Sequence, residues 1–229
     1  MNPAELTHKL SPDDWGFAPS INEAAIALAE RGLVHTVSVS VRRKFARHKI
    51  DELRDLQGEG QVRVALHLDF SFAGCKVRKI HLFTGHALAW REIHEQLWLF
   101  REMGLRLDSL NGHRHVHLYP GVLRDLRFAG VPLRLPADAS HLGSCLAGLI
   151  VRVAKGITWE RAGYLRGRDI AHASHLQRKL TKFPQLLCHP AAFDDFDKAE
   201  MADPLRGERV TEYNRLLYLF EQSQENPRV

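Results

Sequence analysis

Cysteine is scarce in this chain, long apolar runs are missing, and neither sign of charge dominates. The three cysteines, Cys75, Cys145 and Cys188, lie far apart and form no Cys-x-x-Cys pair, which excludes a zinc ribbon and a disulfide framework. Such cysteine usage is typical of a reducing compartment, and the first residues form no apolar signal core, so we expect a cytoplasmic protein. The longest apolar stretch, residues 145–151, is far too short to span a bilayer.

The basic excess is also small. The formal net charge is +5 over 229 residues, and the basic residues are spread along the chain. The one dense cluster comprises Arg42, Arg43 and Lys44, with Arg47 and His48 close behind. A nucleic-acid groove usually needs a larger basic patch with interleaved aromatics, so we expect no nucleic-acid partner. We interpret the cluster as the solvated start of a helix, with a polyanion site as the alternative.

Apolar residues make up 45% of the chain, which suffices for a sizeable core. No linker or repeat divides the sequence, so we expect one domain over residues 1–229. Strand-like patterns occupy residues 34–41, 62–68, 106–112, 131–135 and 185–189. Apolar and polar residues alternate over 34–41, which predicts a half-buried strand there. Helix-like patterns occupy residues 44–57, 87–103, 120–130, 141–155, 169–182 and 208–222. This alternation predicts βα units around a mainly parallel sheet, and about six or seven such units fit an α/β barrel-like domain.

Three segments carry more specific expectations. Ser20 and Glu23 form a capping-box pattern, which predicts a helix that ends at Gly32. Residues 70–86 show little periodicity and predict a long loop of the kind that often serves as a lid. The helix at residues 87–103 contains two tryptophans and a phenylalanine, which we interpret as core packing, with a partner-covering face as the alternative. These three aromatic residues are Trp90, Trp98 and Phe100.

Histidines supply the main chemical signal. His113, His115 and His117 alternate along residues 112–117, and in a strand their side chains point the same way. His113 and His117 are then about 13 Å apart and cannot share an ion. Neighbours such as His113 and His115 can share one, or one ligates while another supports it. The alternative is a ladder of partly buried polar side chains paired to backbone.

Two adjacent carboxylates lie far upstream. Asp13 and Asp14 precede Gly16, a pattern that also suits an ordinary turn. Adjacent side chains on an extended segment diverge, so one carboxylate can bind a metal while its neighbour acts as a base. His67 and His189 are two further candidates, although a lone histidine is often only a core residue. All these residues follow expected strands, and reactive groups collect at the carboxyl ends of parallel strands.

One carboxylate and two imidazoles leave coordination positions open, as catalytic metal sites require. A divalent ion there polarises a carbonyl and acidifies bound water. Asp13 takes the proton from that water, and an imidazole on the opposite side protonates the leaving group. The sequence therefore predicts metal-assisted hydrolysis of an amide or ester. Two histidines favour Zn²⁺ over Mg²⁺ on ligand softness.

These motifs resemble the YdjC-like carbohydrate deacetylases, which include chitooligosaccharide and hopanoid-biosynthesis deacetylases. Five stretches of this sequence match family patterns in order. Residues 12–16 match Ala-Asp-Asp-Phe-Gly, residues 30–38 match Glu-Arg-Gly-Ile-Val-Thr-Ser-Thr-Ser, and residues 65–68 match Gly-Leu-His-Leu. Residues 110–120 match Leu-Asp-Ser-His-x-His-Val-His-x-x-Pro, and residues 189–191 match His-Pro-Gly. A polar loop with an asparagine, here Asn22, follows the first pattern. The resemblance implies a distorted TIM-like barrel that removes acetyl groups from a sugar or glycan, with an N-acetyl amide favoured over an O-acetyl ester.

The resemblance also implies roles by motif position. Asp14, His67 and His113 correspond to metal ligands, Asp13 to the general base and His189 to a catalytic acid. The positions left for supporting or substrate-facing roles are Asn111, Arg114, His115 and His117.

This sequence departs from the family pattern at three places. Pro12 replaces a small residue, Asn111 replaces an aspartate that should orient a neighbouring histidine, and Ala191 replaces a glycine. The Asn111 and Ala191 changes motivate one alternative, a sugar- or polyanion-binding relative with impaired turnover. Another alternative is a different metal-dependent barrel hydrolase, such as a phosphoesterase or amidohydrolase. The sequence is compatible with a homo-oligomer but does not determine the oligomeric state.

Overall fold

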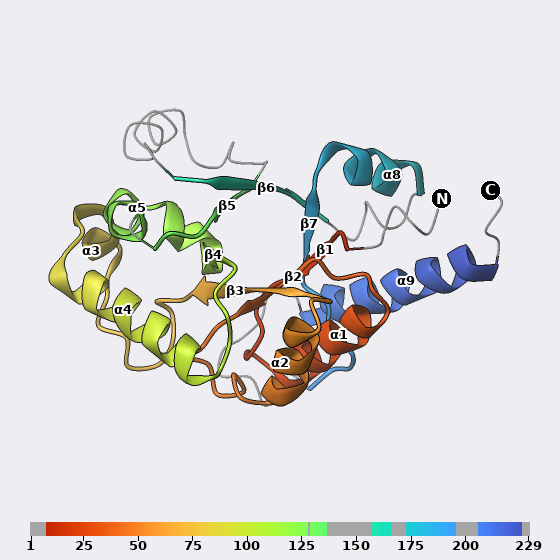
Figure 1. Cartoon of the computed structure of the whole chain (residues 1–229), viewed down its shortest axis with the longest axis horizontal. Helices are drawn as coiled ribbons and strands as arrows, with labels where there is room; N and C mark the ends of the chain where they lie inside the picture. Colours follow the sequence, from red (N-terminus) through yellow and green to blue (C-terminus); the bar gives the residue numbers. More distant parts are fainter. Residues whose placement is uncertain (1–7, 128, 137–156, 166–172, 196–205, 226–229) are drawn as a thin grey trace.

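The chain forms a parallel β-barrel covered by helices. The computed structural model describes residues 8–127, 129–136, 157–165, 173–195 and 206–225. Seven strands form one sheet in the order β1-β7-β6-β5-β4-β3-β2, and every pair of neighbours is parallel (Figure 1). The strands are β1 (Leu10–Pro12), β2 (Thr36–Val39), β3 (Arg63–Leu68), β4 (Ser109–Gly112), β5 (Leu133–Pro136), β6 (Trp159–Tyr164) and β7 (Gln185–Cys188).

The two edge strands of this sheet meet. Isolated bridges join Leu10 to Val34 and Trp15 to Val39, in parallel orientation. The backbone N–H of His35 donates to the Leu10 carbonyl at 2.7 Å. Because these contacts join β1 to β2, the sheet is a nearly closed barrel, and the expected α/β, TIM-like architecture is confirmed.

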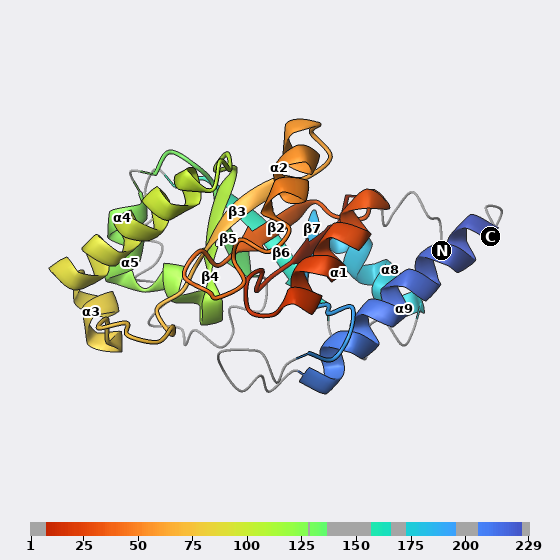
Figure 2. The ribbon, with the colours of Figure 1, turned by 90° about the horizontal axis from the view of Figure 1, so that it is seen from below.

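The helices lie outside the barrel. They are α1 (Pro19–Glu30), α2 (Ile50–Gly58), α3 (Lys79–Thr84), α4 (Ala87–Glu102), α5 (Pro120–Leu126), α8 (Ala173–Lys182) and α9 (Arg206–Glu225). Helices α3, α4 and α5 lie together at one end of the molecule, whereas α9 lies on the side of α1 (Figures 1 and 2). None of the helices in this described part combines the length and apolar character that a bilayer span requires.

Several strands of the barrel are buried on both faces, and some of their polar side chains lie in the barrel interior. All four residues of β2 are buried, as are those of β4 and β7, because helices cover one face of each strand and the barrel interior takes the other. The expectation of a half-buried strand over residues 34–41 was therefore wrong. Its alternating Ser38 does not face water; its hydroxyl accepts a hydrogen bond from Asn111 Nδ2 at 2.9 Å inside the barrel.

Helix α1 begins earlier than the capping box predicted. Pro19 occupies the first turn, where its missing N–H costs nothing, and Ala18 is the N-cap. The Ser20 hydroxyl instead donates to Asp195 Oδ1 at 2.5 Å. This buried contact ties α1 to the loop after β7, so a long-range partner replaced the local cap.

One expectation about a segment was wrong, and one strand was missed. Residues 70–86 are not entirely loop, because α3 forms within them. Strand β6 was not predicted, since its residues include Glu160, Arg161 and Gly163 and show no clear alternation. The helix expected at residues 141–155 lies outside the described residues, as do residues 169–172 of the next one.

The basic cluster after β2 is not a solvated helix start, because α2 begins only at Ile50. Arg43 is buried, and its Nη2 lies 2.5 Å from Asp69 Oδ2. Arg42 Nε lies 2.8 Å from Glu92 Oε1. Acidic side chains from distant segments thus neutralise charges that the local sequence leaves unpaired.

Helix α4 buries only part of its aromatic set. Phe100 is fully buried, whereas Trp90 and Trp98 are 51% and 56% exposed. The interpretation of all three as core packing was therefore right for Phe100 alone. Phe100 lies on the face of α4 that covers the barrel, and the two tryptophans line a groove between α4 and α5.

Candidate metal centre

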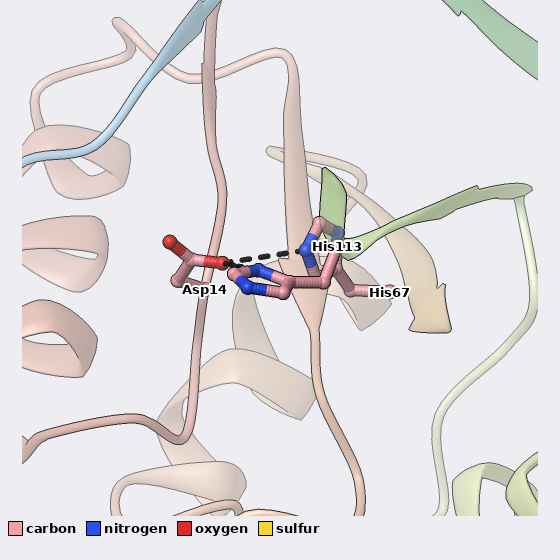
Figure 3. Close-up of side chains that lie close together, drawn as sticks. All are labelled: Asp14, His67 and His113. Atoms are coloured by element: carbon pink, nitrogen blue, oxygen red, sulfur yellow. Dashed lines mark hydrogen bonds and ion pairs between the residues drawn. The ribbon is translucent and has the colours of Figure 1, made fainter. Parts of the chain in front are cut away.

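Three side chains meet at the carboxyl ends of β1, β3 and β4. Asp14, His67 and His113 each offer a ligand atom, and these atoms all lie within 4.8 Å of one another. Asp14 Oδ1 is 3.3 Å from His67 Nε2 and 3.2 Å from His113 Nδ1 (Figure 3). The structure therefore brings together the three residues predicted as metal ligands.

The backbone after β1 is shaped to present Asp14. Asp14 itself has φ +66° and Gly16 has φ +98°; aspartate tolerates the left-handed region better than most residues. The Gly16 N–H donates to Asn22 Oδ1 at 2.8 Å, and Asn22 Nδ2 donates to the carbonyls of Phe45 and His48. Asn22 therefore fixes the turn that aims Asp14 into the barrel mouth.

The histidine motif is not a strand. β4 ends at Gly112, and His113–Leu118 form a short 3₁₀ segment (η2) in which Arg114 and His115 have positive φ. The predicted common direction of the three histidines was therefore wrong. A Cβ on Gly112 would lie 2.8 Å from Val116 Cγ2, so glycine permits the tight reversal that separates the imidazoles.

Each histidine of the motif has a different environment. His113 points at Asp14 and packs against the Phe17 ring at 5.2 Å. His115 Nε2 contacts the Tyr164 hydroxyl, and burial lowers the pKa of His115 to about 4. His117 is fully buried, and its Nε2–H donates to the Arg134 carbonyl at 2.8 Å. His117 thus stabilises β5 by pairing with its backbone. This is the role that the alternative of a polar ladder gave to the histidines of the motif.

His67 has the orientation a metal ligand needs. Its Nδ1 lies 2.5 Å from Asn111 Oδ1. Because an amide oxygen only accepts, we assign the proton to Nδ1, which leaves the lone pair of Nε2 facing Asp14. That Nε2 is buried and has no hydrogen-bond partner among the described residues. A buried acceptor without a donor, between a carboxylate and a second imidazole, fits a divalent cation.

Asp13 points at a different partner. Its two carboxylate oxygens accept from Arg134 Nη1 at 2.7 Å and Nη2 at 2.5 Å, and both side chains are buried. Burial raises the pKa of Asp13, but the Arg134 guanidinium, together with His67 and His189, outweighs that effect and holds the pKa well below its usual range. Arg134 was not predicted; its only sequence signal was one arginine inside the apolar strand at residues 131–135.

Asp14 also has an arginine partner. Arg209 on α9 donates from Nη2 to Asp14 Oδ2 at 2.7 Å, and both side chains are buried. Burial raises the pKa of Asp14, while Arg209 and the contacts with His113 and His67 lower it and prevail. No sequence pattern indicates Arg209, because 195 residues separate it from Asp14.

His189 follows β7 at the same mouth of the barrel. Its backbone N–H donates to Glu212 Oε1 at 2.8 Å. Burial lowers the pKa of His189, and the nearby Asp14 carboxylate opposes this shift, so the imidazole is neutral at rest. Arg114 is exposed, and nothing described places it in contact with the other predicted site residues.

Comparisons with known proteins agree with this geometry. The family model described as YdjC-like protein matches residues 10–218. Two curated relatives, each named carbohydrate deacetylase, come from two strains of Vibrio vulnificus, CMCP6 and YJ016. Each is 24% identical to this chain over 208 residues, covering 80% of this chain and 77% of the relative.

Solved structures share the fold. A protein of Enterococcus faecalis V583, described provisionally as a cellobiose-phosphate cleavage protein, has a TM-score of 0.68 at 17% identity and covers 96% of this chain and 94% of its own. A lactam utilization protein from Thermus thermophilus has a TM-score of 0.52 at 13% identity, covering 95% and 97%. The match of the family model over most of the chain, including every predicted ligand, shows that this chain belongs to the YdjC-like protein family.

Proposed function

We propose that this chain is a metal-dependent deacetylase that removes an acetyl group from a sugar or glycan. Membership in the YdjC-like family and the carbohydrate deacetylase relatives support the reaction class. The single observation that carries the metal dependence is the convergence of Asp14, His67 and His113 within 4.8 Å at the barrel mouth.

The donor set favours zinc. One carboxylate oxygen and two imidazole nitrogens suit Zn²⁺ and leave at least one coordination position for water or substrate. Magnesium prefers all-oxygen sites and is the second candidate. When bound, the cation supplies a Lewis acid for the acetyl carbonyl and lowers the pKa of the attacking water.

Asp13 is the proposed proton acceptor. Its bidentate pair with Arg134 keeps it ionised and fixes its orientation. Each carboxylate oxygen has a second lone-pair direction, so the guanidinium does not exhaust its capacity to accept a proton. The low pKa of Asp13 makes it a weak base, whereas general-base catalysis is most efficient when the pKa of the acceptor lies near the operating pH. Proton transfer to Asp13 therefore depends on a bound cation that acidifies the attacking water.

His189 is the proposed proton donor to the leaving group. Its imidazole is neutral before the reaction, because burial lowers its pKa. Asp14 and Asp13 favour its cationic form, so the neutral imidazole can take up a proton from solvent at the barrel mouth and deliver it to the leaving nitrogen. Asp13 returns the proton that it accepted from the attacking water to solvent after acetate leaves.

The remaining predicted residues divide into two groups. Asn111 and His117 are buried and support other site residues, namely His67 and the strand that carries Arg134. His115 and Arg114 lie on the turn after β4 and are the proposed substrate-facing residues. Their left-handed backbone lifts this turn away from the strand direction.

Acetate release from acetylated sugars tests the proposal. The metal-loaded protein should release acetate from N-acetylated sugars faster than from O-acetylated ones, and chelation should abolish release until zinc is restored. Asp14→Ala should abolish both metal binding and activity. Asp55→Ala is the matched control, because Asp55 is an exposed residue of α2 and should change neither. Acetate release by metal-free Asp14→Ala would overturn the proposal, and a parallel phosphate-ester assay separates a phosphoesterase.

Two further expectations rest on sequence alone. We infer a cytoplasmic location from the scarcity of cysteines. We also infer that residues 1–229 act as one domain, with an acetylated sugar as the partner that matters for the site.

A further inference from the structure

Helix α9 reaches the candidate metal centre through one side chain. Arg209 Nη2 donates to Asp14 Oδ2 at 2.7 Å, while Asp14 Oδ1 faces both imidazoles. We propose that Arg209 restricts Asp14 to coordination through one oxygen, and thereby sets the coordination number of the cation. This inference rests on the proposed metal centre.

The two oxygens of Asp14 are not equivalent. Oδ1 lies 3.2–3.3 Å from the ligand nitrogens of His113 and His67, so it is the oxygen available to a cation between them. Oδ2 is held by a charge-assisted hydrogen bond, which is shorter and stronger than a neutral one. A carboxylate that binds a cation through both oxygens would have to surrender this bond.

Burial makes that exchange unfavourable. The side chains of Arg209 and Asp14 are only 3% and 4% exposed, so water cannot readily replace either partner. Removing one member of a buried pair leaves an uncompensated charge, which is strongly destabilising. The one-oxygen arrangement is therefore the stable state of Asp14 in this fold.

Arg209 is itself held in place. Its carbonyl accepts the N–H of Ala191 at 3.3 Å. Its neighbour Val210 packs against Ala18, Ile21 and Ala191. One turn later, Glu212 accepts the His189 N–H. The start of α9 is thus fastened to both α1 and the loop after β7, so the guanidinium has a fixed position relative to Asp14.

Two consequences follow for the site. A one-oxygen carboxylate with two imidazoles fills three positions, which leaves room for both water and an acetyl oxygen. The guanidinium charge also competes with a cation for Asp14, so it lowers metal affinity. Arg209 therefore weakens metal binding and keeps the coordination sphere open, and this makes it a positioning residue.

Cobalt binding tests the inference without reference to activity. Co²⁺ is titrated into metal-free wild type, Arg209→Ala, Arg209→Lys and Arg215→Ala, and its visible absorption is recorded. The intensity of these bands falls as the coordination number of Co²⁺ rises. Arg215 is an exposed residue of the same helix and serves as the matched control.

The expected result has a definite sign. Arg209→Ala should bind Co²⁺ severalfold more tightly and give weaker bands, because Oδ2 becomes free to join the coordination sphere. Arg209→Lys and Arg215→Ala should resemble the wild type. Weaker binding with unchanged bands in Arg209→Ala would overturn the inference and reduce Arg209 to a structural role.

Two other outcomes can be distinguished from a failure of the inference itself. If Arg209→Ala does not fold, the neutral Arg209→Gln variant is measured by the same criteria, against Arg209→Lys. If the wild type binds no Co²⁺, or if Asp14→Ala binds it as well as the wild type does, the proposed metal centre is wrong and the inference falls with it.

Discussion

Asn111 Oδ1 lies 2.5 Å from His67 Nδ1, although 44 residues separate them in the chain. Sheet register explains the contact, because His67 on β3 pairs directly with Asn111 on β4. The Asn111 amide also donates to Ser38 on β2, so three adjacent strands fix one imidazole. Asn111, which departs from the aspartate that the resemblance led us to expect, therefore still contacts His67 Nδ1, but without the charge of a carboxylate.

The first prediction concerns this contact. Asn111→Leu should weaken metal binding by about 10–100-fold, because His67 loses the group that fixes its tautomer. Asn111→Asp should bind metal more tightly than the wild type, since a carboxylate raises the basicity of the imidazole. Competition with a chelator measures both constants. Unchanged affinity in Asn111→Leu would show that Asn111 does not orient the ligand.

The second prediction concerns the buried pair of Asp13 and Arg134. Arg134→Met should destabilise the fold by about 3–5 kcal/mol, because it leaves a buried carboxylate without its partner. The double variant with Asp13→Asn should recover part of that loss, since both charges are then gone. Urea unfolding at neutral pH gives the free energies for this double-mutant cycle. Strict additivity of the two single changes would argue against the pair.

The third prediction is a pH dependence set by Glu212. Burial raises the pKa of Glu212 from 4.5 to about 7, so between these values the folded state holds a proton that the unfolded state has released. Stability contributed at this position is therefore present below about pH 4.5 and is lost as pH rises toward 7. Glu212→Gln should remove this loss, which amounts to at most about 3 kcal/mol.

Unfolding of Glu212→Gln and wild type across this range provides the measurement. The stability advantage of the variant should grow as pH rises and level off above about pH 7. A constant difference at all pH values would mean that Glu212 does not titrate in this window. Glu221 is exposed on the same helix, so Glu221→Gln serves as the control and should track the wild type.

The fourth prediction concerns the turn after β1. Gly16 has φ +98°, and a Cβ there would lie 3.0 Å from the Ser40 carbonyl. Gly60 has φ +75° but open space around it. Gly60→Ala should therefore cost only backbone strain of about 1–2 kcal/mol, whereas Gly16→Ala should cost roughly 3 kcal/mol or more. Equal thermal stability of the two variants would contradict this account of the turn.

The grouping of the three candidate ligands could be predicted from the sequence because each of them has a local signature. Asp14 and His113 lie just after β1 and β4, and His67 is the penultimate residue of β3; parallel strands present their carboxyl ends at one barrel mouth. The positions along the chain therefore sufficed to group the three residues, and the family resemblance selected them from the other candidates.

The direction of the other histidines could not be predicted in this way. The two-residue period of His115 and His117 holds only in a strand, and the chain reverses after Gly112. The alternating pattern of three histidines does not reveal that reversal. The reversal depends on the close approach of Gly112 to Leu68 and Val116, which is a property of the folded chain.

The arginine partners of Asp13 and Asp14 could not be predicted from the sequence either. Arg134 and Arg209 lie 121 and 195 residues from Asp13 and Asp14, respectively. Their pairing depends on the closure of the barrel and on the packing of α9 against α1, and neither leaves a periodic signal. For the same reason Arg43 was interpreted as solvated, although Asp69 neutralises it inside the protein.

Anomalous diffraction at the zinc absorption edge, from crystals of zinc-loaded protein, tests the central claim most directly. The account predicts one strong peak at about 2.0–2.2 Å from Asp14 Oδ1, His67 Nε2 and His113 Nδ1 together. A zinc-loaded crystal with no peak between these three atoms, or with its peak bound to other residues, would contradict it.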